Sequence, residues 1–335
     1  MKKRKKSAGK PRYLILLFLI LTLIAHTIWS NVTVGITRYV VQSSAIPSAF
    51  NQYKIAHVSD LHNAEFGKEN GKLLNLLSKE RPNIIAITGD LVDANHTNIK
   101  VALALIAQAT EIAPCYFVTG NHEAWIGDQY KILKSSLESM GVNILENERI
   151  ILEMEGAEIS LIGLEDPDTV DRDESVQASI IDESLKPFTE DENYKILLSH
   201  RPEQFDVYVK HKVDLVLSGH AHGGQVRIPF LGGLVAPNQG FFPKYDNGQY
   251  SEGTTNMIVS RGLGNSIIPI RINNRPELVI ITLENIVEQS FEQYKDIYKK
   301  SPSVTERLYA PDPAPGIRGI LGETRCFLSS ADDAE

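Results

Sequence analysis

The sequence predicts an α/β fold. Over residues 53–140, short apolar runs rich in β-branched and aromatic residues alternate with segments of helical periodicity. Alternation at this spacing is typical of βαβ units, in which helices cover a largely parallel sheet. The chain has 335 residues, of which 42% are hydrophobic, so it is long enough to bury a substantial core.

The chain begins with a basic segment, residues 1–12, which contains seven Lys or Arg and no acidic residue. Residues 13–32 follow without an Asp, Glu, Lys or Arg and are long enough to cross a bilayer, so we expect a transmembrane signal-anchor. The basic flank predicts a cytoplasmic N-terminus and an extracytoplasmic domain at the cell membrane. The alternative is a cleaved signal peptide with Leu14–Ala25 as its apolar core, which would make the protein secreted.

A linker or first strand is expected at residues 33–49, and one domain over residues 50–285. In its first half we expect strands at 53–60, 83–90 and 115–121, and helices at 72–80, 99–112 and 128–140. From about residue 150 most runs favour strands, at 149–155, 157–164, 194–200, 213–220, 256–262 and 277–283. We therefore expect a second, strand-rich half packed on the first. Residues 286–335 predict a helix and a poorly ordered tail.

The net charge is −8, and because the first twelve residues are basic, the remaining chain is more acidic still. Nucleic-acid binders neutralise phosphates with clustered Lys and Arg, so we expect no nucleic-acid partner. A phosphorylated substrate remains compatible with the composition if a metal supplies the local positive charge. The sequence leaves the oligomeric state open.

Polar side chains with metal-binding groups follow five of the predicted strands. They are Asp60 and His62; Asp90 and Asp93; Asn121, His122 and Glu123; His200; and His220 and His222. Individually, a Gly-Asp pair is often a turn, Asn121 could cap a helix, and His200 could be half-buried. The carboxyl ends of neighbouring strands share one edge of a sheet, so five such loops together predict a metal site.

The candidate ligands are two Asp, one Asn and four His, with no thiolate. That number exceeds what one ion needs and suits two ions that share a carboxylate. Oxygen and nitrogen ligands favour Mn, Fe, Zn, Co or Ni. The glycines at 219, 223 and 224 would let the backbone pass close to the ions.

Five blocks carry a resemblance to a known family: DLH at 60–62, GDLVD at 89–93, GNHE at 120–123, His200, and GHAH at 219–222. They resemble, in order, the signature of the calcineurin-like metallophosphoesterases. The resemblance spans about residues 50–285, and it is closest to the bacterial YkuE/YaeI-like membrane-anchored subgroup.

The resemblance implies a four-layer α/β/β/α sandwich of two mixed sheets, with two divalent ions (Mn, Fe, Zn or similar) at one edge. It also implies a role for each matched residue. One ion would bind Asp60, His62 and His222, the other would bind Asn121, His200 and His220, and Asp90 would bridge them. His122 would face the phosphate, either as a cation or as a hydrogen-bond donor, and assist the leaving oxygen. Asp93 and Glu123 would orient ligand groups, whereas Arg201 and Gln225 would either touch the substrate or have a surface role.

The implied activity is hydrolysis of a phosphodiester or pyrophosphate by a metal-bridging hydroxide, outside the cytoplasmic membrane. The substrate would be a phosphorylated small molecule or a lipid-linked one. One alternative is a pyrophosphatase of the type that acts on UDP-sugar lipids, and another is a non-catalytic, metal-stabilised surface binding module. Residues 228–250, rich in Gly, Pro and aromatic residues, would form either a substrate-facing loop or a packed connection.

Overall fold

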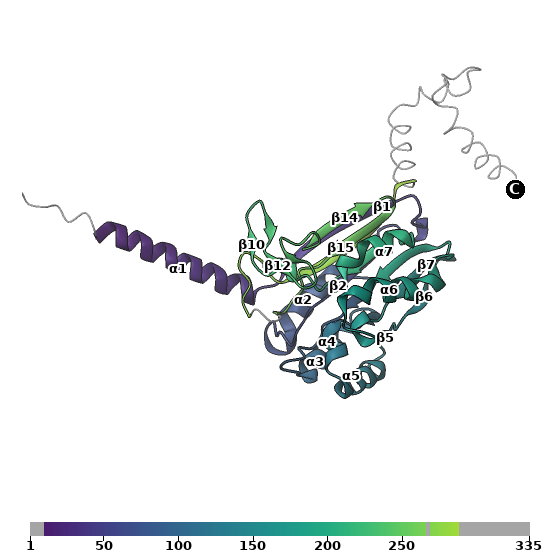
Figure 1. Cartoon of the computed structure of the whole chain (residues 1–335), viewed down its shortest axis with the longest axis horizontal. Coiled ribbons are helices and arrows are strands. Elements are labelled where there is room, and N and C mark those ends of the chain that lie inside the picture. The colour runs from purple at the N-terminus through teal and green to yellow at the C-terminus, as the bar shows by residue number, and fades with distance from the viewer. Residues whose placement is uncertain (1–9, 266–268, 288–335) are drawn as a thin grey trace, which may run out of the picture. The chain divides into compact units, whose positions relative to one another are not determined.

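The structure is a computed structural model that describes residues 10–265 and 269–287 (Figure 1). The chain divides into two compact units, residues 1–285 and residues 286–335. Of the second unit, only Ile286 and Val287 are among the described residues. The expected C-terminal helix and tail from residue 288 onward, and residues 1–9 of the basic segment, lie outside the described residues.

Helix α1 (Lys10–Val32) contains the apolar segment. Within Arg12–Val32, an 18-residue stretch has a mean hydropathy of 2.1, and only 6% of that stretch is buried by the rest of the protein. At a rise of about 1.5 Å per residue, a helix of this length matches the thickness of a bilayer core. Its length and composition therefore suit a membrane anchor or a signal sequence.

The first of two large sheets has six strands in the order β1-β16-β2-β3-β4-β5. Their bounds are β1 (Gly35–Ser43), β16 (Glu277–Asn285), β2 (Lys54–Val58), β3 (Ile84–Thr88), β4 (Cys115–Val118) and β5 (Asn143–Ile144). Strand β16 runs antiparallel to β2, and the other neighbours are parallel. The sheet is therefore mixed.

The second large sheet also has six strands, in the order β14-β15-β9-β8-β7-β6. Their bounds are β14 (Gly248–Glu252), β15 (Thr255–Val259), β9 (Leu215–Ser218), β8 (Tyr194–Leu198), β7 (Ala157–Gly163) and β6 (Glu148–Met154). The inner strands β15, β9, β8 and β7 are parallel, and the two edge strands are antiparallel to their neighbours. Two small hairpins lie between β9 and β14, formed by β10 (Arg227–Ile228) with β11 (Gly232–Gly233) and by β12 (Val235–Ala236) with β13 (Gly240–Phe241).

Helices cover the outer faces of both sheets. The first sheet packs against α2 (Gly71–Glu80), α3 (Ile99–Ala109) and α5 (Asp128–Ser139), and the second against α6 (Glu174–Leu185) and α7 (Phe205–Lys210). A short helix, α4 (Asn121–Trp125), follows β4. Single 3₁₀ turns are η1 (Ser48–Phe50), η2 (Lys68–Asn70), η3 (Pro167–Thr169), η4 (Lys186–Phe188), η5 (Pro202–Gln204) and η6 (His222–Gly224).

The inner faces of the two sheets pack on each other. Ile55 and Ile281 of the first sheet share one buried cluster with Leu161 and Ile196 of the second, and all four side chains are fully buried. Two further clusters lie between each sheet and its own helices. These layers confirm the expected four-layer α/β/β/α fold with two mixed sheets.

The structure differs from the sequence-based expectation at residues 277–283. This run was expected in the strand-rich second half, but β16 lies in the first sheet, between β1 and β2. A buried strand reads as a continuous apolar run in either sheet, so the pattern identifies the strand without identifying its neighbours. The segment 33–49 contains strand β1, which pairs with β16 along its whole length.

Candidate metal centre

Strands of both sheets deliver their C-terminal loops to one place. Asp60 and His62 follow β2, Asp90 follows β3, and Asn121 opens α4 directly after β4. From the second sheet, His200 follows β8, and His220 and His222 follow β9. The structure brings side chains from both sheets into two groups of closely spaced metal-binding atoms.

The first group contains Asp60, His62, Asp90 and His222, whose ligand atoms lie within 4.8 Å of one another. His62 Nε2 lies 3.2 Å from His222 Nε2 and 3.3 Å from Asp90 Oδ2. His222 Nε2 is in turn 3.4 Å from Asp60 Oδ1. Nitrogen and oxygen atoms thus converge on one small volume.

The second group contains Asp90, His200 and His220. His200 Nε2 lies 3.2 Å from Asp90 Oδ2 and 3.2 Å from His220 Nδ1. Asp90 Oδ2 therefore belongs to both groups. Asn121 lines the same cavity as Asp90 and His220.

Unpaired buried atoms show whether these residues suit cations. Asp60 Oδ2, His62 Nδ1 and Asn121 Oδ1 are buried and have no hydrogen-bond partner among the described residues. Asp60 and Asp90 are almost completely buried, and an unpaired buried carboxylate oxygen is unfavourable. Divalent cations would satisfy these atoms, so the site fits metals that prefer oxygen and nitrogen ligands.

Hydrogen bonds orient the rings of two histidines. His200 Nδ1 donates to the carbonyl oxygen of Thr88 at 2.7 Å, so its Nε2 points toward the second group. His220 Nε2 lies 2.9 Å from Asn238 Oδ1 and 3.3 Å from Arg201 Nη1, so its Nδ1 points the same way. These two nitrogens face each other across the second group. Such outer partners orient imidazole ligands in metal sites.

The backbone around the site is unusual. Five of the seven candidate ligands have a positive φ, between 43° and 65°: Asp60, His62, Asp90, His220 and His222. Side chains larger than glycine rarely adopt this conformation, and it persists where the surrounding structure enforces it, often at functional sites. Space is also limited, because a Cβ at Gly219 would lie 1.9 Å from Ser59 Oγ and 2.4 Å from Asp60 Oδ2.

His122 is buried beside the first group, with its ring 4.4 Å from that of His62. The backbone N–H of Ala94 donates to His122 Nδ1 at 2.9 Å. Because Nδ1 accepts a hydrogen bond, the ring proton resides on Nε2, and burial also lowers the pKa of His122. Of the two forms expected from the sequence, the structure favours the neutral donor over the cation.

Glu123 organises the loop that carries Asp90. Its carboxylate accepts hydrogen bonds from the backbone N–H groups of Asp90 at 2.7 Å, Gly120 at 2.8 Å and Leu91 at 2.9 Å. Burial, and next the Asp90 carboxylate, raise the pKa of Glu123 to about 7, whereas these N–H donors favour its charged form. Asp93 accepts from the N–H groups of Asn95 and His96, and its Oδ2 lies 3.9 Å from His62 Nδ1, beyond hydrogen-bonding distance.

Arg201 is buried, so the alternative of a surface role is wrong. Its guanidinium forms two hydrogen bonds of 2.7 Å with Asp166, and Nη1 donates to Asn238 Oδ1 at 3.2 Å. The guanidinium also lines the cavity at the metal-binding groups. Gln225 is buried, and its side-chain amide donates to the carbonyl oxygen of Ile270.

A cavity of about 320 Å³ opens at the two groups. Its wall also includes Trp125, Asp168, Arg172, Glu174 and Gln177, none of which is a sequence-predicted candidate, and Pro237 and Asn238 from the segment 228–250. Trp125 Nε1 donates to Asp168 Oδ2 at 2.8 Å, and the Arg172 guanidinium lies 5.8 Å from the centre of the Trp125 ring. Trp125 had a signal in the sequence because it lies one helical turn after His122, and Pro237 and Asn238 had one because they lie in the segment considered as a substrate-facing loop.

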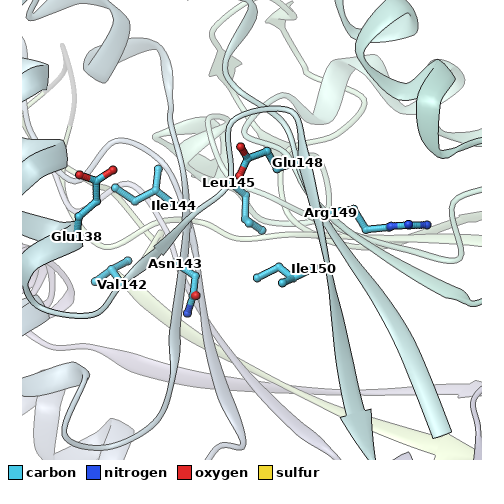
Figure 2. Close-up of a pocket in the computed structure, with 8 residues that line it drawn as sticks. All are labelled: Glu138, Val142, Asn143, Ile144, Leu145, Glu148, Arg149 and Ile150. Atoms are coloured by element: carbon cyan, nitrogen blue, oxygen red, sulfur yellow. The ribbon is translucent and has the colours of Figure 1, made fainter.

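A second cavity, of about 330 Å³, lies at the start of β5 and β6 (Figure 2). Its lining includes Glu138, Glu148 and Arg149, and none of the candidate ligands. The Arg149 guanidinium is paired with Asp191 at 2.8 Å. This cavity lacks the convergent imidazoles and carboxylates that distinguish the first.

Comparison with known proteins agrees with this geometry. Residues 53–224 match the family described as calcineurin-like phosphoesterase. The chain is 30% identical over 254 residues to the uncharacterized metallophosphoesterase YkuE of Bacillus subtilis, which covers 74% of this chain and 85% of that protein.

Two further relatives are more distant. Phosphodiesterase YaeI of Escherichia coli is 27% identical over 240 residues, which are 69% of this chain and 82% of YaeI. A bovine (Bos taurus) transmembrane protein with a metallophosphoesterase domain is 28% identical over 263 residues, which are 75% of this chain and 57% of that protein. The matched segment contains all five motif blocks, so the chain belongs to the calcineurin-like phosphoesterase family.

Proposed function

We propose that the protein hydrolyses phosphodiesters with two divalent ions, which the residues of the two groups would hold. Family membership makes it a metal-dependent phosphoester hydrolase. One relative, YaeI, bears the name phosphodiesterase, which favours a diester among the possible substrates. When bound, two such ions would polarise the phosphoryl oxygens and lower the pKa of a water between them.

One observation supports two ions rather than one. Asp90 Oδ2 lies 3.3 Å from His62 Nε2 in the first group and 3.2 Å from His200 Nε2 in the second. One carboxylate oxygen placed between two sets of imidazoles suits a bridging ligand better than a ligand of one ion. Asp60, His62 and His222 would then serve one ion, and Asn121, His200 and His220 the other.

The remaining residues would act on the substrate or on the ligands. His122 carries a proton on Nε2 and lines the cavity, so it would donate a hydrogen bond to the departing ester oxygen. Arg172 lies at the cavity wall over Trp125, and its charge would contact a second phosphoryl group in a pyrophosphate. Glu123 would hold the Asp90 loop in place.

The direct test is hydrolysis of bis(p-nitrophenyl) phosphate by the full-length chain loaded with Mn²⁺, with metal content measured by elemental analysis. We expect about two ions per chain, and a loss of about 10²–10⁴-fold in kcat for His122→Asn with its metal content retained. A p-nitrophenyl monoester and a pyrophosphate diester, assayed in parallel, define the preference. Two tightly bound ions without cleavage of any ester would instead favour the non-catalytic binding module.

We also propose that α1 is an uncleaved anchor, with the enzyme on the extracytoplasmic side. The support is that the apolar, exposed part of α1 directly follows seven basic residues. The test uses a Cys326→Ser chain with a cysteine in place of Ile132, which is exposed on α5. In intact bacterial cells that express this chain, the new cysteine should react with a membrane-impermeant maleimide. Labelling only after lysis would place the domain in the cytoplasm, and a chain shortened at its N-terminus would indicate a cleaved signal.

A further inference from the structure

Six large apolar side chains are exposed in two segments outside the sandwich. Four belong to the hairpins that precede β14, and two flank Arg271; we call them the apolar patch. Its members are Phe230, Leu231, Phe241, Phe242, Ile270 and Ile272, each at least 40% exposed. Soluble proteins rarely group so many exposed aromatic and aliphatic side chains unless the surface has a partner.

The two segments are joined to each other. The backbone N–H of Arg227 donates to the Ile272 carbonyl at 3.0 Å, and Val226 forms a β-bridge with Ile272. Leu234, between the hairpins, donates to the Val226 carbonyl at 2.8 Å. The patch residues therefore belong to one connected structure rather than to independent loops.

The segment around Arg271 is also attached to the C-terminal end of α1. The Asn31 side chain forms two hydrogen bonds of 2.8 Å with the backbone N–H and carbonyl of Arg271, the residue between Ile270 and Ile272. The Arg275 guanidinium lies 4.8 Å from the centre of the Trp29 ring and donates to the Val34 carbonyl. Figure 1 shows β10 and β12 near this end of the helix.

These contacts indicate where the patch lies relative to a bilayer that contains α1. Trp at the end of an apolar helix marks the head-group region, and an Arg beside it has the same preference. Asn31 comes two residues after Trp29, which is about 3 Å along a helix. Asn31 binds the backbone of Arg271. Arg271 and its neighbours Ile270 and Ile272 therefore lie at the level where α1 leaves the lipid.

The joined segments that carry the apolar patch also contact the metal-binding groups on their inner side. The buried Arg271 guanidinium lies 3.3 Å from His222 Nδ1. Asn238, in the turn between β12 and β13, accepts hydrogen bonds from His220 and Arg201, and it lines the cavity with Pro237. The wall of the cavity and the apolar patch are thus parts of the same short segment.

We propose that the apolar patch rests in the head-group region of the membrane that anchors α1, and that the enzyme acts on amphiphilic phosphoesters whose tails stay in that bilayer. This inference rests on the proposed function and on α1 being an anchor. The occupant of the patch is the lipid surface, because the patch continues the boundary defined by Trp29 and Arg275. A protein partner or a second copy of the chain would have no reason to follow that boundary.

A depth measurement tests the contact without using activity. The full-length Cys326→Ser chain, with Phe241→Cys labelled by an environment-sensitive nitrobenzoxadiazole dye, is reconstituted in vesicles of phosphatidylethanolamine and phosphatidylglycerol. The matched control carries the dye at Ile132→Cys, which is 59% exposed on α5. We expect blue-shifted emission and quenching by a lipid-borne quencher at position 241 only. Equal spectra at both positions, or a shift that needs high protein concentration rather than lipid, would overturn the inference.

A matched pair of esters tests the substrate class. The chain with Phe230, Leu231, Phe241 and Phe242 all changed to Ser is assayed on p-nitrophenyl hexadecyl phosphate in the same vesicles and on p-nitrophenyl ethyl phosphate in solution. We expect a loss of about tenfold or more on the hexadecyl ester and less than about twofold on the ethyl ester, because membrane binding scales with buried apolar area. Ile132→Ser should change neither rate.

The outcomes separate the two proposals. Equal losses on both esters, or none on either, would overturn the membrane-contact inference while leaving the phosphodiesterase intact. If the unmodified chain hydrolyses neither ester, the proposed function fails, and the dye measurement still decides whether the patch touches lipid.

Discussion

Asp90 contacts several different parts of the candidate metal centre. Its Oδ2 lies between His62 and His200, its Oδ1 accepts the backbone N–H of His122 at 2.9 Å, and its own N–H donates to Glu123. One residue therefore links the two groups, His122 and the loop that Glu123 holds. A substitution there tests the geometry more sharply than one at any single imidazole.

The first prediction is that Asp90→Asn removes most of the metal and the activity. The amide keeps the shape of the side chain but lacks the negative charge needed to bridge two cations. We expect fewer than two ions per chain by elemental analysis and a loss of more than about 100-fold in kcat/KM, since changes to outer partners alone cost 10–100-fold. A variant that retains both ions would show that another residue bridges them.

The second prediction concerns Glu203, a buried carboxyl with no hydrogen-bond partner among the described residues. Its Oε1 lies 3.8 Å from Arg201 Nη1, and burial raises the pKa of Glu203 to about 7. The folded state holds this proton between pH 4.5 and 7 while the unfolded state releases it, so the contribution to stability is present below pH 4.5 and is lost as the pH rises to 7.

Glu203→Gln should abolish that dependence. The free energy of unfolding of the variant, relative to the unmodified chain, should rise by roughly 2–3 kcal/mol between pH 4.5 and 7, at 1.36 kcal/mol per pKa unit. Both proteins are unfolded with urea in the same detergent and in the presence of a chelator. Circular dichroism at each pH then gives the difference between their free energies of unfolding. A constant difference across this range would mean that Glu203 has an ordinary pKa.

At the scale of single residues, the sequence predicted the candidate ligands but not the side chains that contact them. Asp60, His62 and Asp90 stand in short motifs at strand ends, where the chain itself brings them to one edge. Asn238, which contacts His220 Nε2, lies in a hairpin with no motif. Arg271 lies 49 positions from His222, and only the pairing of distant loops brings them together.

Among the elements, the turn from β4 into α4 has little spare room. Gly120 has an ordinary backbone conformation, with φ −105°, so conformation alone does not require glycine. A Cβ there would lie 2.3 Å from Asp90 Oδ1 and 2.8 Å from the Asp90 nitrogen. The close approach of α4 to the β3 loop is what places Asn121 and His122 beside Asp90.

The third prediction follows from this contact. Gly120→Ala should push the two loops apart, reduce metal content and lower kcat/KM by about 100-fold, because misplacement of reacting groups by about 1 Å has effects of this size. Gly71→Ala, at a helix start with nothing within 4 Å of the added carbon, is the matched control and should be neutral or slightly stabilising. Equal effects of the two changes would remove the steric argument.

The alternation of apolar runs with helical segments identified the strands and helices, but it did not identify which strands pair with each other. Strands β2, β3 and β4 were expected from their β-branched runs, and each ends close to the predicted residue. The membership of β16 in the first sheet depends on its pairing with β1 and β2. These pairings span more than 200 positions, so no local pattern specifies them.

For the whole molecule, the candidate metal centre lies where the two sheets meet. Asp60 and Asp90 come from the first sheet, and His200, His220 and His222 come from the second. Bound ions would therefore join the sheets, in addition to the apolar layer between them. Without ions, buried atoms such as Asp60 Oδ2 would have no partner.

The fourth prediction is that metal removal destabilises the whole sandwich rather than one loop. Saturation at 100 times the dissociation constant contributes about 2.7 kcal/mol per site. For a domain of this size that corresponds to a fall in Tm of roughly 5–10 °C when a chelator removes one ion, at 2–4 °C per kcal/mol. Differential scanning calorimetry with and without chelator measures it, and re-addition of Mn²⁺ should restore the original Tm.

Asp90→Asn provides the control for this coupling. Because the variant lacks the bridging carboxylate, its Tm should respond to Mn²⁺ by less than half as much as that of the unmodified chain. The Glu203→Gln variant should respond fully, since its side chain is not among the candidate ligands. If Asp90→Asn gained as much stability from Mn²⁺ as the unmodified chain, the ions would bind without Asp90, and the two sheets would not be joined through it.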